Sequence, residues 1–213
     1  MEYLPKSIKY LEFYEGDAQT IPSAALTNLK FLFLNTCDLT DTGLEVFSTL
    51  TNPTPIRYLN LSENNIPKVC DLIGPSIEKG FFPNLSFLVL KDCGIEEIIL
   101  LLQALTIGGI KLKNLNLSSN EITLKNEINS QLFKEFITKY LPNEIDFSLN
   151  RINSQAALGL GKLIEGLETL VNLMDNSEDI PYLSFPSNIK VGNTDINDSI
   201  MSGETVEFNM TDI

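Results

Sequence analysis

Histidine is absent from this chain of 213 residues, and cysteine occurs only three times. Without histidine, most nucleophile–base pairs of enzymes and most zinc sites cannot be built. The cysteines lack Cys-x-x-Cys spacing, and the sequence holds no Gly-x-x-x-x-Gly-Lys-Ser/Thr phosphate loop. We therefore expect a protein that is not an enzyme and that carries no metal and no cofactor.

Long apolar runs are missing as well. No stretch approaches the roughly 18 apolar residues that span a bilayer, so we expect no membrane insertion. The opening residues Met-Glu-Tyr-Leu-Pro-Lys show neither the basic nor the apolar region of a signal peptide. Asn-x-Ser sequons at Asn60 and Asn116 fall within predicted strands, where a glycan would block the expected binding surface. These features favour the cytoplasm, with the nucleus as the alternative.

Positive charge is in the minority. The chain has 15 Lys and Arg against 28 Asp and Glu, for a net charge of -13. From Asp175 onward there are eight acids and a single base, Lys190. This balance repels a phosphate backbone, so we expect no nucleic-acid binding. We expect a protein partner that is either basic or carries an apolar segment.

The sequence does contain a repeat of about 28 residues, with the frame Leu-x-x-Leu-x-Leu-x-x-(Asn/Cys)-x-Leu. A period of this length indicates a stack of small units, each of which buries its apolar face against its neighbours. The copies, of which the last is the weakest, cover residues 29–39, 56–66, 85–95, 112–122 and 142–152.

Each copy predicts a strand, a turn and a returning helix. In the first copy, alternation directs Leu32 and Leu34 inward and Phe31 and Phe33 outward. The Asn or Cys lies in the turn, where an amide can satisfy buried backbone groups and a thiol does so more weakly. Helical spacing of apolar residues follows the turns. It places helices from Thr40 onward and near residues 72–77, 98–105, 132–140 and 154–167.

These motifs resemble a known family. The segment Leu29-Lys-Phe-Leu-Phe-Leu-Asn-Thr-Cys-Asp-Leu-Thr-Asp-Thr-Gly-Leu44 resembles a leucine-rich repeat of the ribonuclease-inhibitor type, and Leu115-Asn-Leu-Ser-Ser-Asn-Glu-Ile122 resembles its core. The resemblance implies an α/β fold: a right-handed solenoid arc with parallel strands on the concave face and helices on the convex face. It implies about five to six repeats within residues 1–175, followed by an acidic C-terminal cap or partly disordered tail over residues 176–213.

Both ends of the stack depart from the frame. Leu11 and Phe13 suit a first strand, but that unit is too short for a full helix. At the other end two registers compete. The one we favour continues the fifth helix to about Leu173 and places a last strand near residues 182–185. The other keeps the 28-residue spacing and puts Leu170, Leu173, Asp175 and Glu178 at the frame positions. No polar cap precedes the first strand, which favours a subunit of a larger complex.

Outward positions of the strands form lines across the stack. One line reads Tyr10, Phe31, Tyr58, Phe87, Asn114, Glu144, and the next reads Glu12, Phe33, Asn60, Val89, Asn116, Asp146. We call the first four residues of the first line the aromatic track. Aromatic residues suit any strand, yet an exposed apolar strip of this size usually marks an interaction site. The predicted partner-binding residues are Tyr10, Tyr14, Phe31, Phe33, Tyr58, Asn60, Phe87, Val89, Asn114 and Asn116.

The leading functional hypothesis is a non-enzymatic protein-interaction scaffold or assembly subunit that binds a protein through this face. Repeats of this style followed by an acidic tail also resemble the GTPase-activating proteins of the Ran GTPase, which gives a regulatory alternative. A cytoskeletal or axonemal component is a second alternative, supported by fold analogy alone. The carboxylates Glu144 and Asp146 are expected to be a solvated rim and not an acid–base pair.

Overall fold

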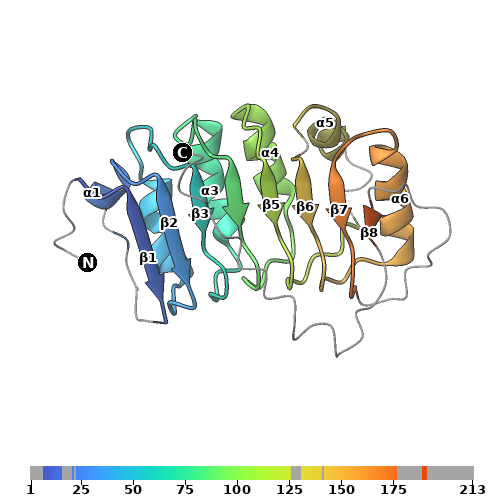
Figure 1. Cartoon of the computed structure of the whole chain (residues 1–213), viewed down its shortest axis with the longest axis horizontal. Coiled ribbons are helices and arrows are strands. Elements are labelled where there is room, and N and C mark those ends of the chain that lie inside the picture. Colours follow the sequence, from blue (N-terminus) through green and yellow to red (C-terminus); the bar gives the residue numbers. More distant parts are fainter. Residues whose placement is uncertain are drawn as a thin grey trace.

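The computed structural model describes residues 7–15, 21, 23–125, 131–140, 142–176 and 189–190. In this part of the chain, eight parallel strands form one open sheet whose order follows the sequence from β1 to β8 (Figure 1). The strands are β1 (Tyr10–Tyr14), β2 (Phe31–Asn35), β3 (Tyr58–Asn60), β4 (Phe87–Val89), β5 (Asn114–Asn116), β6 (Glu144–Asp146), β7 (Leu170–Asn172) and β8 (Ile189–Lys190). The predicted α/β class with a parallel sheet is confirmed, and the sheet is consistent with a leucine-rich-repeat arc.

Helical segments alternate with the strands, as parallel pairing requires. They are α1 (Ser23–Leu26), the 3-10 turn η1 (Asp41–Leu44), α2 (Glu45–Ser48), α3 (Val69–Glu78), α4 (Ile99–Ile107), α5 (Gln131–Lys139) and α6 (Ser154–Ile164). From α2 to α6 each helix packs against the next one along the chain, and Figure 1 shows α3, α4 and α6 behind the layer of strands. The handedness of the arc and its concave side stay predictions.

The core lies between the strand layer and the helix layer. The leucines and isoleucines of the repeat frame are almost all fully buried, and Phe47, Phe82, Phe133 and Phe136 fill the space from the helix side and the loops that join helix to strand. Burying one such side chain contributes about 2 kcal/mol. Leu32 and Leu34 are buried while Phe31 and Phe33 are half-buried, so the alternation predicted for this strand is confirmed.

A buried asparagine in the turn ties neighbouring repeats together. The Oδ1 atom of Asn120 accepts hydrogen bonds from the backbone N–H groups of Cys93 and Ile95 in the preceding repeat, both at 3.0 Å. Its Nδ2 group donates to the carbonyl oxygen of Leu90 in the preceding repeat at 2.8 Å, and to two carbonyls of its own turn. Equivalent bonds are made by Asn64, Asn150 and Asn176. We call these four residues the asparagine ladder.

Cysteine replaces asparagine in two turns. The Sγ atom of Cys37 lies 3.1 Å from the carbonyl oxygen of Asn35, and that of Cys93 lies 3.4 Å from the carbonyl oxygen of Leu61. A thiol offers one weak donor, whereas an amide offers two donors and an acceptor. Both cysteines are buried free thiols.

The residue just before each turn position adopts a left-handed backbone. Its φ lies between +51° and +59° in every described repeat from β2 to β7. This conformation costs about 1–2 kcal/mol in a residue other than glycine. In each repeat, the hydrogen bonds of the turn therefore offset the cost of this backbone conformation. The residues concerned are Thr36, Glu63, Asp92, Ser119, Leu149 and Asp175.

The favoured register of the last repeats was wrong. Helix α6 ends at Ile164 and does not continue to Leu173, because the backbone turns extended at Glu165 and Gly166 follows with φ +80°. Strand β7 starts at Leu170, but the competing register is two residues off, so it was wrong as well. In the observed register Leu170 pairs with Glu144 and Val171 with Ile145. Sequence reasoning missed it because Glu168 stands where the frame has its first leucine.

The two ends of the chain are only partly described. The predicted strand near residues 182–185 and nearly all of the predicted tail lie outside the described residues; the exceptions are Asn176 in the ladder and β8, which pairs with β7. At the other end, α1 has four residues, so no full helix is described for the first unit, as predicted. Leu11 is buried but Phe13 keeps 37% of its surface exposed, so the core is less complete there.

Asn120→Ala should lower the free energy of unfolding by about 3 kcal/mol, because several buried backbone groups lose their partner. Cys93→Ala should lower it by about 1 kcal/mol, since only a weak donor and little volume are lost. Urea denaturation followed by circular dichroism gives both values. Equal losses for the two variants would contradict a special role for the asparagine amide.

Candidate functional site

The strand register brings the predicted outward residues into line. Tyr10 pairs with Phe31, Phe31 with Tyr58 and Tyr58 with Phe87, so the aromatic track is continuous from β1 to β4. The line continues through Asn114 to Glu144. The side chains of Phe31, Tyr58 and Phe87 are half-buried, and Tyr10 is 51% exposed. The predicted alignment is confirmed; contact with a partner stays a prediction.

The rings of the track pack on one another. Phe33, from the neighbouring line, lies 5.3 Å from the Tyr10 ring and stacks at 4.7 Å on the ring of Tyr58. Tyr58 stacks on Phe87 at 5.3 Å with an interplanar angle of 16°. Since Phe33 bridges two members of the track, it belongs to the same surface. In the stacked pairs the faces of neighbouring rings turn toward each other.

Two tyrosine hydroxyls of the track have altered acidity. The hydroxyl of Tyr10 donates to Glu12 Oε2 at 2.6 Å. This hydrogen bond, together with burial and the charge of Glu12, raises the pKa of Tyr10 to about 12. Burial raises the pKa of Tyr58. Both residues therefore stay neutral at physiological pH and present an uncharged surface.

The amides beside the track serve the backbone. Asn60 Oδ1 accepts from the Ser62 backbone N–H at 3.0 Å and from the Ser62 hydroxyl at 2.6 Å. Asn116 binds Ser118 in the same way. Both serines are buried, because each strand ends before them. The Asn-x-Ser pattern is thus explained by a local turn.

The remaining predicted residues flank the track. Tyr14, 62% exposed, lies at the end of β1, and Val89 is half-buried on β4. Asn114 donates through Nδ2 to Glu144 Oε2 at 2.9 Å. The later strands therefore present amides and carboxylates that already bond to each other, whereas the first four strands present aromatic rings.

Sequence reasoning missed a row of cations beside the track. Lys9, Lys30, Arg57 and Lys113 each immediately precede a residue of the first outward line. We call them the cationic row. The signal was present in the sequence, because these residues follow the same period as the track. Lys113 Nζ also lies 6.0 Å from the centre of the Phe87 ring, which joins row and track.

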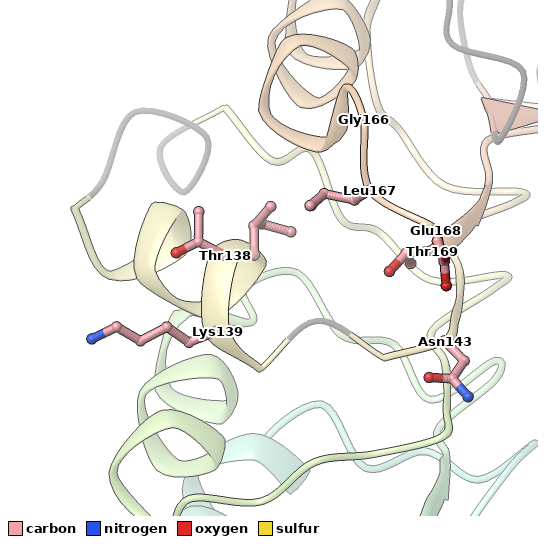
Figure 2. A pocket seen from close by; sticks show the side chains of 8 residues that line it. Thr138, Lys139, Asn143, Gly166, Leu167, Glu168 and Thr169 are labelled. Atoms are coloured by element: carbon pink, nitrogen blue, oxygen red, sulfur yellow. The ribbon is translucent and has the colours of Figure 1, made fainter.

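Two shallow hollows lie where helices return to strands. The larger, about 600 Å³, lies between the end of α5 and the segment leading to β7; Figure 2 shows Thr138 and Lys139 across from Leu167 and Thr169. Its one lysine pairs with Glu135. The smaller, about 440 Å³, is lined by residues that include Arg57 and Lys111.

Reactive groups are scarce in the described part of the chain. Burial raises the pKa of Cys70 and of Cys93 to about 12, and it raises that of Cys37, so the neutral thiol persists at physiological pH. Among described residues, no three Cys, Asp or Glu side chains gather as a metal site would require. No described helix has the length and apolar character needed to cross a membrane.

Comparison with known proteins gives limited similarity. No family model matches the chain. A disease resistance protein of Arabidopsis thaliana is 31% identical over 111 residues, which is 49% of this chain and 9% of that protein. The chain thus covers less than a tenth of that relative. The similarity agrees with the parallel-sheet repeat architecture.

Glu12→Gln should return the pKa of Tyr10 from about 12 toward its ordinary value of 10.0, because the charged acceptor is removed. In the wild type the raised pKa favours folding below pH 10, and this contribution should fade as the pH rises toward 12. The titration is followed by NMR of the labelled Tyr10 ring, with Tyr14 as internal control. An unchanged Tyr10 pKa in the variant would contradict the hydrogen bond.

Proposed function

We propose that this chain is a non-enzymatic protein-interaction scaffold of the ribonuclease-inhibitor-like leucine-rich-repeat type, and that it holds a protein partner against the aromatic track. The observation that carries the proposal is the continuous stack of half-exposed rings from Tyr10 to Phe87. Tyrosine and phenylalanine are enriched at the centres of protein interfaces.

Pre-ordering of the rings supports binding. Each ring of the central stack is held by its neighbours, and the strands beneath are locked by parallel pairing. Side chains that are already ordered lose less conformational entropy when a partner arrives. The preference of aromatic residues for strands would explain one or two such residues, but not a packed strip that remains open to solvent.

The polar groups support binding over catalysis. Glu144 accepts from Asn114, and Asp146 Oδ1 accepts from the Ser148 backbone N–H at 2.9 Å, so this carboxylate pair serves the sheet. The cysteines are buried neutral thiols without disulfide partners, a state that suits a reducing compartment such as the cytoplasm. Residence in a larger complex fits a protein whose main feature is an interaction surface.

Phe31→Ala with Phe87→Ala should weaken partner binding by about thirtyfold, the loss expected when about 2 kcal/mol of central contacts is removed. Affinity purification with quantitative mass spectrometry compares proteins recovered by the wild type and by the variant. The strongest wild-type interactors should be depleted.

A matched control removes two exposed apolar side chains from the helix layer. Leu100 and Ile107 on α4 are 47% and 60% exposed, so Leu100→Ala with Ile107→Ala removes comparable apolar surface elsewhere. This variant should recover the same proteins as the wild type. Equal recovery by the track variant, with its fold verified by denaturation, would sink the proposal.

A further inference from the structure

We infer that the partner segment held on this face is acidic: an extended stretch whose carboxylates meet the cationic row while its apolar side chains lie on the aromatic track. This inference rests on the proposed function and names the chemistry of the partner.

The backbone of the cationic row is hydrogen-bonded from strand to strand, with Ser86 in place of a cation before β4. The Lys30 N–H donates to the Lys9 carbonyl and the Arg57 N–H to the Lys30 carbonyl, both at 2.8 Å. The chain of bonds continues through Ser86 to Lys113, at 2.9 and 2.6 Å. With strands about 4.8 Å apart, the row spans roughly 19 Å, the length of about six residues of an extended segment.

The charges of the row lack acidic partners within the described part of the chain. Ion pairs there join Lys91 to Glu63, Lys139 to Glu135 and Arg151 to Glu121, and all of them lie outside the row. Glu12, the acid nearest to the start of the track, accepts the Tyr10 hydroxyl. The row is therefore an unneutralised line of positive charge in a chain whose net charge is -13.

Net charge alone would suggest a basic partner. At the contact surface, however, nearby charges act more strongly on the partner than the net charge of the chain. At physiological salt, interactions between exposed charges fade beyond about 8 Å. Lys113 Nζ lies 6.0 Å from the centre of the Phe87 ring, so a segment on the track comes close to this charge. Of the carboxylates in the outward lines, Glu12 accepts from the Tyr10 hydroxyl and Glu144 from the Asn114 amide. Local complementarity therefore favours carboxylates on the partner.

The aromatic rings point to the same partner class. Because Tyr58 is stacked between Phe33 and Phe87, both faces of its ring have a neighbouring ring. Ring edges carry partial positive charge, which favours carboxylate and carbonyl oxygens and accepts aliphatic groups. Single-stranded nucleic acid needs open ring faces on which its bases stack, and this packing withholds them.

Fluorescence anisotropy with synthetic probes tests the inference. The first probe is a labelled eight-residue peptide that alternates Glu and Leu; the second replaces every Glu with Gln; the third is an oligonucleotide of eight thymidines. The wild type should bind the Glu peptide at least about tenfold more tightly than the Gln peptide. Arg57→Glu with Lys113→Glu should abolish this preference, and the milder Arg57→Gln with Lys113→Gln should reduce it.

A charge-matched control is provided by Lys134→Glu with Lys162→Glu, because both lysines are exposed on α5 and α6. This variant should keep the preference for the Glu peptide. Equal affinity for the Glu and Gln peptides, tighter binding of the oligonucleotide, or no binding of the Glu peptide would each overturn the acidic partner. If both peptides bind equally and Phe31→Ala with Phe87→Ala weakens both, the inference fails while the proposed binding face stands.

Discussion

Everything on the exposed face depends on the way the turns satisfy their buried backbone groups. Each turn carries a left-handed residue such as Ser119 and places N–H and carbonyl groups away from water. Such groups are costly when unpaired. The asparagine ladder pairs them across repeats, so one strand is fixed relative to the next. The ladder therefore supports the same register that burial of the frame leucines favours.

Because the register is fixed, side chains at equivalent positions of successive repeats lie next to each other on the exposed face. Tyr58 stacks on Phe87 because β3 and β4 pair without offset, and Lys30 meets Arg57 for the same reason. A slip of one residue would turn the aromatic rings into the core and the frame leucines outward. The same constraint that stabilises the stack therefore builds the candidate binding surface.

Sequence reasoning correctly predicted the features that follow from the repeat period. It placed Leu32 inward, Phe31 outward and the aromatic track in line, since all three follow from alternation and a constant repeat length. It failed where one residue breaks the pattern, as Glu168 does before β7. It also could not foresee that Asn60 turns back to bind Ser62, because that depends on where a strand ends. The cationic row follows the same period as the track, but the net charge of -13 masks it.

Each repeat contributes one side chain to each line of the exposed face. A substitution at Arg57 or Phe87 therefore changes one position of the exposed face and leaves the turns that stabilise the stack unchanged. Duplication of one repeat would lengthen the surface by one strand spacing, about 4.8 Å, and add one position to each line. Each repeat is encoded by its own stretch of sequence. A point mutation can therefore change the binding chemistry at one position of the face, and a change in repeat number can change the length of the face.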